Sequence, residues 1–539
     1  MRARTTASSS RVLLALAALA VAACASAPAR VAAPAAPAAP APVTTAPVTT
    51  APVTTAPVTT APVATAPPAA PTATNGHLRA GIVSVRVTGQ DWNWRAPWEK
   101  QAPWTRTVTG LVVPGPRILV ASTAFGNHLL VEAQKLGSEA RTVARVELVD
   151  QEGPLALVAV DDPAFWDGLL PLPLAERAPA EGDVTILRWQ RSGLLDSYPG
   201  TLRQVRSGRH GLSQTSLLTL EIGASTDGLG ESEVVVAKGR VAGLVTGRAG
   251  DAYAALAAPV LAQFLAGAAK GDWRSFARAG LAWQDLTNPA LRELVGLQPG
   301  ETGVRLTRVA LHGSAGGVLK PGDVVLEMGG AKLDPTGYYE HPLYGRMLFA
   351  LLFSDGRQPG DTMPVRVLRD GARLDLQLPL RAMRPDEDRV PPYVFGREPE
   401  YVVVGGLVFE ELTRPYLGAW GDWARRAPPR LLVAIDREPD EAGTEPGHIV
   451  LLSSVLPDAA NLGYQELRDL IVERVNGRPV ASLADVRRAL TAPQGGFQVV
   501  DFVAGQGFTR LVLDATEAEA AAARLHQTYG VEKLDSAAP

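Results

Sequence analysis

Short apolar runs separated by Gly and Pro fill residues 77–270, and they constrain the fold more than any other feature of the chain. The clearest runs are 80–87, 109–113, 117–121, 155–160 and 240–245. Many short strands at this spacing indicate an all-β barrel or sandwich. A helical pattern over Ala255–Ala269 follows them and is expected to close the domain. The folded part extends to about residue 530, which is long enough for three domains.

Composition excludes several classes of function. The formal net charge is −3, and no long basic run stands out, so nucleic acid is not expected as a partner. The seven histidines are scattered without an HExxH spacing, so no metal site is predicted. Cys24 is the only cysteine, which leaves neither a disulfide framework nor a thiolate metal site. No glycine triplet of the dinucleotide-binding type opens a helix, and no cofactor is expected.

The first 23 residues predict the compartment. Arg2, Arg4 and Arg11 form a basic region, and the apolar run Val12–Ala23 is too short to span a bilayer as a helix. The run ends in Val-Ala-Ala-Cys at Cys24, which resembles the lipobox of bacterial lipoproteins. That resemblance implies a signal peptide over 1–23, a lipid on Cys24 and transfer to the outer membrane, facing the periplasm. An ordinary signal peptide with an incidental cysteine is the alternative.

A tether is predicted between the lipid and the folded part. From Ala41 the pentad Ala-Pro-Val-Thr-Thr occurs four times in succession. Proline at every fifth position removes amide donors and fixes φ, so neither helix nor sheet can propagate. The Ala/Pro/Thr composition also lacks the large apolar groups that would offset the entropy of ordering. We therefore interpret residues 24–76 as a linker that begins at the lipid-bearing cysteine.

Three segments of 77–270 resemble the trypsin-like serine proteases of the HtrA/Do group. Thr109–Val113, followed by Arg117-Ile-Leu, resembles the strands before the catalytic histidine. The stretch 150–162 resembles the strand that follows the catalytic aspartate, and Lys238-Gly-Arg-Val-Ala-Gly-Leu resembles the hairpin after the nucleophile. The resemblance covers roughly 450 of the 539 residues. It implies a mainly β fold, in which a trypsin-like double β-barrel is followed by two PDZ (α+β) domains.

The catalytic triad is missing when the resemblance is carried over position by position. The general base falls on Thr123, which cannot take a proton near pH 7, and the orienting aspartate falls on Pro154. Counting back from Lys238 puts the nucleophile at Gly230. Because a triad acts as a unit, these substitutions predict that no catalytic residue remains.

Ser232 is the fallback nucleophile if the hairpin is two residues shorter. Family members flank their serine with Asn and two glycines, whereas Glu231 and Glu233 flank Ser232. Negative charge at both neighbours would oppose an oxyanion, so a solvated loop serine is the preferred interpretation.

Residues 279–383 resemble the first PDZ domain of these proteases. Leu319–Leu326, with its Pro-Gly-Asp turn, is the strongest match. Ala279, Gly280, Leu281 and Ala282 stand where the family has its carboxylate-binding loop. In that fold the loop amides receive a peptide C-terminus while the peptide pairs with a sheet edge.

Residues 395–525 resemble the second PDZ domain of the Do-like subgroup. Val450–Pro457 and Val472–Gly477 carry much of this resemblance. Gly405, Gly406 and Leu407 would form its loop. This module either binds peptide or packs on another domain or subunit.

The function expected from these features is that of a membrane-tethered pseudoprotease in envelope protein quality control. Its expected partners are exposed C-termini or unfolded protein segments, with an active HtrA-type protease or further copies of the chain as additional partners. Two alternatives stay open, namely an active endopeptidase that uses Ser232 and a purely structural envelope lipoprotein.

Overall fold

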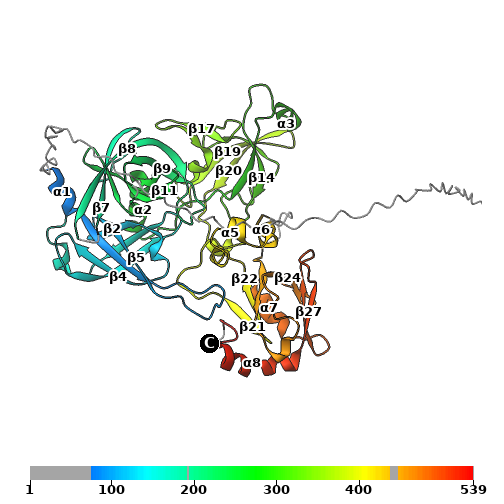
Figure 1. The fold of residues 1–539 in the computed structure, drawn as a ribbon. Helices are drawn as coiled ribbons and strands as arrows, with labels where there is room; N and C mark the ends of the chain where they lie inside the picture. The colour runs from blue at the N-terminus through cyan, green and yellow to red at the C-terminus, as the bar shows by residue number, and fades with distance from the viewer. Residues whose placement is uncertain (1–73, 191–192, 227, 437–446, 538–539) are drawn as a thin grey trace, which may run out of the picture. The chain divides into compact units, whose positions relative to one another are not determined.

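A computed structural model describes residues 74–190, 193–226, 228–436 and 447–537 (Figure 1). The predicted signal peptide, Cys24 and nearly all of the linker lie outside the described residues. The described residues belong to one compact unit. Of the residues described, no helix is both long and apolar enough to cross a bilayer.

The first half of the predicted protease domain is a closed barrel of six strands. Helix α1 (Thr74–Ala80) precedes it. The strands are β1 (Ile82–Gly89), β2 (Trp104–Val113), β3 (Arg117–Ala121), β4 (His128–Lys135), β5 (Arg141–Asp150) and β6 (Leu155–Ala159). They pair in the order β1-β2-β3-β6-β5-β4. Alternate residues of β1, namely Val83, Val85 and Val87, are fully buried in the barrel core, as the period-two pattern of a strand requires.

A second closed barrel follows in the chain. Its strands are β7 (Gly182–Trp189), β8 (Leu195–Gly208), β9 (Leu217–Ala224), β10 (Val234–Ala237), β11 (Arg240–Ala249) and β12 (Ala252–Ala257). They pair in the order β10-β11-β12-β9-β8-β7. Short 3-10 helices η1 (Thr123–Phe125) and η2 (Pro163–Trp166) lie in the loops of the first barrel.

The helix that closes this region is α2 (Ala258–Lys270), so the predicted start at Ala255 is wrong by three residues. Residues 252–257 instead form β12, which pairs with both β11 and β9. Pro259 lies in the first turn of α2, where backbone amides have no partner within the helix, so its lack of an amide hydrogen costs nothing. Gly271 ends the helix in the left-handed conformation at φ 73°.

An antiparallel sheet begins eleven residues beyond α2, at Leu281, with the strand order β13-β14-β15-β19-β20. The elements of this region are β13 (Leu281–Asp285), α3 (Pro289–Leu294), β14 (Val304–Val309), β15 (Val324–Met328), β16 (Ala331–Lys332), β17 (Tyr338–His341), β18 (Gly345–Leu348), η3 (Phe349–Phe353), β19 (Thr362–Arg369) and β20 (Ala372–Pro379). Asn288 caps α3 by accepting hydrogen bonds from the amides of Ala290 and Leu291. Strand β13 lies at the end of the sheet order.

The last region is a second antiparallel sheet with the order β21-β22-β23-β24-β26-β27. Its elements are η4 (Pro385–Glu387), β21 (Tyr401–Val404), β22 (Leu407–Glu411), α4 (Arg414–Gly418), α5 (Trp423–Arg426), α6 (Pro429–Asp436), β23 (Val450–Val455), η5 (Ala459–Asn461), β24 (Leu470–Val475), β25 (Arg478–Pro479), α7 (Leu483–Leu490), β26 (Phe497–Phe502), β27 (Arg510–Asp514) and α8 (Ala515–Tyr529). Figure 1 shows α8 in red beneath this sheet.

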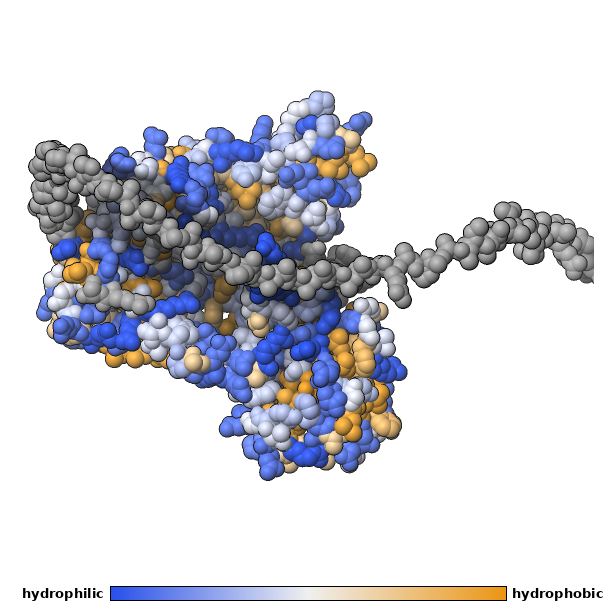
Figure 2. Space-filling view, viewed as in Figure 1, coloured by the Kyte–Doolittle hydropathy of each residue, from blue (hydrophilic) through white to orange (hydrophobic). Residues whose placement is uncertain are grey.

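The predicted fold class is confirmed: the chain is mainly β, with two six-stranded barrels and a C-terminal PDZ domain. Hydrophobic and hydrophilic residues are interspersed over the face in Figure 2, as on ordinary protein surfaces.

Candidate functional site: a barrel junction at the triad positions

The structure brings Thr123 and Pro154 together. Thr123 begins η1 just after β3, and Pro154 immediately precedes β6. These two strands pair with Ala121 opposite Leu155, which places both positions at the same end of the pair. Gly211, on the loop between β8 and β9, lies against both, because a Cβ there would be 2.8 Å from Thr123 Cγ2 and 3.8 Å from Pro154 Cβ. The triad positions of the first barrel therefore form one site.

The second barrel contributes Glu231 to this site. One carboxylate oxygen of Glu231 accepts a hydrogen bond from Thr123 Oγ1 at 3.1 Å. The other accepts from Ser122 Oγ at 2.6 Å and from the Thr123 amide at 3.3 Å. The side chain that contacts Thr123, the predicted base position, therefore belongs to Glu231, one residue after the predicted nucleophile position Gly230. The sequence indicated Glu231 only as a negative charge beside Ser232. It did not predict that the Glu231 carboxylate would be hydrogen-bonded to Thr123.

Ser232 faces inward. Its side chain is fully buried, and its Oγ accepts a hydrogen bond from the Ala121 amide at 2.9 Å. The Ser232 amide donates to the Val245 carbonyl at 2.6 Å. The interpretation of Ser232 as a solvated loop serine is wrong, because these two hydrogen bonds fix it between β3 and β11. Its φ of 68° lies in the left-handed region, where a residue with a side chain is strained.

Two histidines lie near the site, and both are committed elsewhere. The Nδ1 atom of His128 is 2.8 Å from the Phe125 carbonyl. His210 Nδ1 and Nε2 lie 2.6 and 2.7 Å from the hydroxyls of Thr246 and Thr219. Burial lowers the pKa of His210 to about 3, so the ring is neutral near pH 7 and is a weak base. Within the part of the chain that the structure describes, neither ring is hydrogen-bonded to Ser232.

Two acidic residues just before Pro154, Asp150 and Glu152, are hydrogen-bonded to distant parts of the same domain. Asp150 is buried and accepts hydrogen bonds from the Trp273 indole at 2.6 Å and Ser275 Oγ at 3.0 Å. Burial raises the pKa of the Asp150 carboxyl above its usual range. Glu152 accepts from Thr215 Oγ1 at 2.8 Å and so anchors the loop that carries Gly211.

Glu233 adds a second carboxylate behind Glu231. It is 4% exposed, and one of its oxygens accepts a hydrogen bond from the Gly230 amide at 2.8 Å. Burial raises the pKa of Glu233 to about 7. The Gly230 amide, an oxyanion donor in a working protease loop, is therefore engaged by a carboxylate.

The predicted peptide loop at 279–282 precedes β13, the strand at the end of the sheet order. Gly280 has φ 66°, and a Cβ there would be 3.0 Å from Gly313 Cα, so only glycine fits this turn. Leu281 and Ala282 then begin β13, whose partner in the sheet is β14. In the middle of β13, the Trp283 ring packs edge-on against Phe349, with centroids 4.8 Å apart. The outer edge of β13 has the geometry for strand addition by a peptide.

The predicted loop at 405–407 lies between strands whose edges are already paired. Gly405 and Gly406 have φ 53° and 87° and form the turn between β21 and β22. Strand β22, which begins at Leu407, pairs with β21 on one side and β23 on the other. The outer edge of β21 is covered in turn, since the Val403 amide donates to the Leu534 carbonyl at 2.6 Å. Both edges next to this loop are thus occupied by the chain itself.

Comparison with known proteins places the chain among homologues. Residues 390–538 match the family model described as PDZ domain. The putative protease Do-like 3, mitochondrial, of Arabidopsis thaliana is 26% identical over 392 residues, which cover 72% of this chain and 67% of that protein. Protease Do-like 2, chloroplastic, of the same plant is 24% identical over 464 residues, which cover 85% and 74%. This chain is a homologue of the Do-like proteases.

Among solved structures, the HtrA-type protease AlgW with decapeptide aligns at 17% identity and a TM-score of 0.42, covering 58% of this chain and 98% of that one.

For this Do-like homologue, the PDZ match also extends past the predicted domain limits of 395 and 525. The extension at the C-terminal end includes Leu534 and Ser536, which hydrogen-bond to Val403 and Tyr401 of β21.

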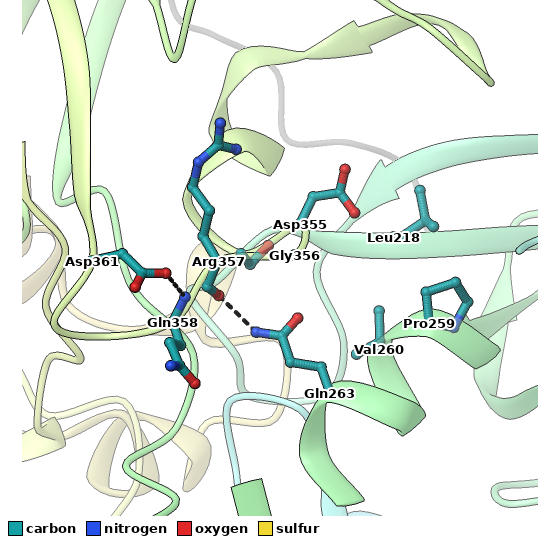
Figure 3. Close-up of a pocket in the computed structure, with 10 residues that line it drawn as sticks. Leu218, Pro259, Val260, Gln263, Asp355, Gly356, Arg357, Gln358 and Asp361 are labelled. Carbon is teal, nitrogen blue, oxygen red and sulfur yellow. Dashed lines mark hydrogen bonds between the residues drawn. The ribbon is translucent and has the colours of Figure 1, made fainter. Parts of the chain in front are cut away.

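Part of the surface of the Do-like homologue is hollowed where the second barrel meets the sheet of residues 281–379 (Figure 3). This cavity has a volume of about 350 Å³. Figure 3 shows Gln263 of α2 pointing towards the loop after η3, where its side-chain amide donates to the Arg357 carbonyl at 2.6 Å. Nearby, Ser354 Oγ donates to the Ser216 carbonyl at 2.5 Å. These contacts connect the two regions.

Across the described residues, no cluster of His, Cys, Asp and Glu suits a metal ion.

Proposed function

We propose that this Do-like homologue is a pseudoprotease that binds polypeptides without cleaving them. The observation that carries the proposal is the carboxylate of Glu231 hydrogen-bonded to Thr123, in the space between the barrels where a serine and a histidine would have to meet. A nucleophilic serine needs a neighbouring base to take its proton. Thr123 supplies no base, Pro154 supplies no carboxylate, and Ser232 Oγ is held by a backbone amide.

Electrostatics add to this argument. Acyl transfer develops negative charge on an oxyanion, which donors such as backbone amides stabilise. Here the carboxylates of Glu231 and Glu233 lie at the loop that would supply those donors, and the Gly230 amide is bonded to Glu233. Negative charge at this place raises the barrier to the reaction.

Peptide recognition is proposed for the edge of β13. The edge follows the glycine turn at Gly280, and half-buried Leu281 and Trp283 give it apolar side chains for contact with a ligand. Main-chain hydrogen bonds along such an edge give affinity, and side-chain pockets give selectivity. The proposed ligands are exposed C-termini or unfolded segments. An active HtrA-type protease in the same compartment is a further proposed partner, to which bound segments would be presented.

The proposed location is the cell envelope, with a lipid on Cys24 and the Ala/Pro/Thr-rich segment as a tether. This part of the proposal rests on the sequence of residues 1–76. Replacing Cys24 by Ser removes the thiol, so the full-length protein should no longer incorporate radiolabelled palmitate in bacterial cells. Palmitate incorporation that persists in the Cys24→Ser variant would refute the lipid site.

The binding role can be tested with a library of peptides that differ at their C-termini. Full-length protein in detergent should select a subset of free-acid peptides by fluorescence anisotropy, and C-terminal amidation should weaken their binding. Gly280→Val should abolish selection because its side chain meets Gly313. Gly300→Val is the matched control, since Gly300 has a similar φ of 87° and open space around it. No selection by the wild-type protein would leave only a structural role.

A further inference from the structure

Residues 392–398 belong to the connection between the two antiparallel sheets, and we call this segment the strap. The hydroxyl of Tyr393 donates a hydrogen bond to Glu152 Oε1 of the first barrel, at 3.3 Å. Glu152 lies two residues before the triad position Pro154 and is 4% exposed. Its other oxygen, Oε2, already accepts from Thr215 Oγ1. Oε1 is therefore the acceptor that faces the strap, and a tyrosine hydroxyl reaches it.

The second aromatic side chain of the strap lies on the other loop of the triad positions. Phe395 packs against Gly126, because a Cβ at that glycine would be 2.4 Å from the phenyl ring. Gly126 directly follows η1, which begins at Thr123. The amide of Gly396 donates a hydrogen bond to Asn127 Oδ1 at 3.2 Å. The strap thus contacts both loops of the first barrel that carry triad positions.

The chemistry of these contacts suits a particular kind of polypeptide segment. The rings of Tyr393 and Phe395 stack with centroids 5.4 Å apart, so they occupy the barrel loops as a pair. One contact needs a hydroxyl donor, the second needs a flat ring above a residue without a side chain, and the third uses a main-chain amide. Any extended segment with the sequence Tyr-x-Phe can make the same three contacts.

The strap can leave the barrel without unfolding its neighbours, because the chain is fixed on both sides of it. Upstream, the carboxylate of Asp388 accepts two hydrogen bonds from Arg278, at 2.6 and 3.0 Å. The Pro391 carbonyl accepts from the Arg414 amide at 2.9 Å. Downstream, β21 begins at Tyr401 within its own sheet. Both strap rings are only half-buried, and segments with little buried apolar surface open locally at low free energy.

We propose that the two barrel loops form a binding site for an extended polypeptide segment with the sequence Tyr-x-Phe, and that the strap fills this site until such a segment displaces it. The proposal rests on the polypeptide-holding role given above and adds a second binding site, apart from the edge of β13. Because the strap is tethered at both ends, its local concentration at the site is high. It therefore shields the site from isolated weak ligands.

The ligand is tested with full-length protein and a peptide that has the sequence of residues 390–397. The peptide carries a fluorophore at its N-terminus and is amidated, so that C-terminal recognition is absent from the measurement. The double variant Tyr393→Ser/Phe395→Ser no longer fills the site, and it should bind the peptide about tenfold more tightly than the wild type does, or better. A peptide with serine at both aromatic positions is the control and should not bind.

A third peptide tests the role of Glu152. It has phenylalanine in place of the tyrosine, which removes the donor to Glu152 Oε1 and keeps the ring. Because a buried carboxylate oxygen then loses its partner, this peptide should bind the double variant several-fold more weakly. Equal binding of the tyrosine and phenylalanine peptides would overturn the role of Glu152 as the acceptor.

Gly126→Ala tests the site from the barrel side. Gly126 has a φ of −61°, which alanine adopts without strain, and the new methyl group meets the Phe395 ring. In the otherwise wild-type protein, hydrogen exchange of the strap amides should become about tenfold faster. In the double variant, Gly126→Ala should abolish binding of the peptide. Gly418→Ala is the matched control and should change neither, because Gly418 lies in α4 with open space around its Cβ position.

The proposal is overturned if the double variant binds the peptide no more tightly than the wild type, or if the control peptide with two serines binds equally well. It is also overturned if Gly126→Ala leaves the hydrogen exchange of the strap unchanged. Selection of free C-termini and the absence of proteolysis are measured with other ligands and probes. Failure of this proposal is therefore distinct from failure of the pseudoprotease proposal.

Discussion

Glu231 Oε1 and Thr123 Oγ1 are 3.1 Å apart, and this hydrogen bond joins the two barrels at the triad positions. Two further bonds from Ser122 and the Thr123 amide end on the same carboxylate. Under the proposed function, this hydrogen-bonded contact stands where an active protease carries its triad.

Removal of that contact should destabilise the barrel pair. Glu231→Ala leaves the hydroxyls of Ser122 and Thr123 without their acceptor, and we expect a loss of about 1–3 kcal/mol in the free energy of unfolding. Urea denaturation followed by circular dichroism measures it. Glu176→Ala serves as the exposed control and should change stability by less than about 0.5 kcal/mol. Equal stability of the two variants would mean that the contact is not structural.

Substitutions of Ser232 should separate a structural serine from a nucleophile. Both Ser232→Ala and Ser232→Gly remove the acceptor of the Ala121 amide, but only glycine relieves the positive φ of 68°. Ser232→Gly should therefore be more stable than Ser232→Ala by about 0.5–1 kcal/mol. Thermal unfolding compares them. A less stable glycine variant would contradict the strained backbone.

Arg95 should hold the segment before β2 against the C-terminal domain. Its Nη1 lies 2.7 Å from Asp469 Oδ1 and 3.1 Å from the Tyr416 hydroxyl, and its guanidinium stacks 3.8 Å from the Trp420 ring centroid. Arg95→Ala leaves the buried Asp469 carboxylate without its cation but with the hydrogen bond from the Tyr416 hydroxyl, at an expected cost of about 1–3 kcal/mol.

Hydrogen exchange measures this effect locally. Amides of residues 465–470 should exchange faster in Arg95→Ala, and Arg95→Lys should not restore protection, because lysine cannot stack as a planar group. Lys100→Ala is the control from the same segment, since Lys100 is exposed. Unchanged exchange in Arg95→Ala would show that the contact does not contribute.

Glu410 should make the C-terminal domain less stable at high pH. Burial raises the pKa of this carboxyl to about 8, and both of its oxygens lack hydrogen-bond partners among the described residues. Because the folded state holds the proton more tightly than the unfolded chain, the stabilising contribution is complete below about pH 4.5 and is lost as pH rises through 8.

Glu410→Gln should therefore remove most of the decline in stability between pH 5 and 9 and be more stable than the wild type at pH 9 by more than about 1 kcal/mol. Thermal unfolding at both pH values measures the difference, with Glu519→Gln on the exposed face of α8 as the control. A pH profile that is identical in the wild type and Glu410→Gln would refute the assignment to this residue.

The fold could be predicted from the sequence because strand signals and turn residues recur at short range. The alternating valines of β1 and the Pro-Gly-Asp turn at 321–323 are local patterns, and both occur in the structure as expected. The start of α2 was misplaced because Ala252–Ala257 reads equally well as helix, and its two strand partners are distant in the sequence.

Side-chain direction at the triad positions could not be predicted from the sequence. Residue counting gives Gly230, but the register between β10 and β11 shifts by one residue between Val235 and Val236, a feature that only strand pairing reveals. Glu231 and Ser232 therefore could not be assigned to opposite sides of the loop beforehand. The covered edges around Gly405 and Gly406 were equally hidden, because the covering residue Leu534 lies about 130 positions further along the chain.

The most direct test of the central claim is incubation of full-length protein with unfolded casein, and separately with a fluorophosphonate probe for activated serines, beside an active HtrA protease. We predict intact casein and no labelling in the wild type and in Ser232→Ala alike. Casein cleavage together with labelling that Ser232→Ala abolishes would contradict the account and identify Ser232 as a working nucleophile.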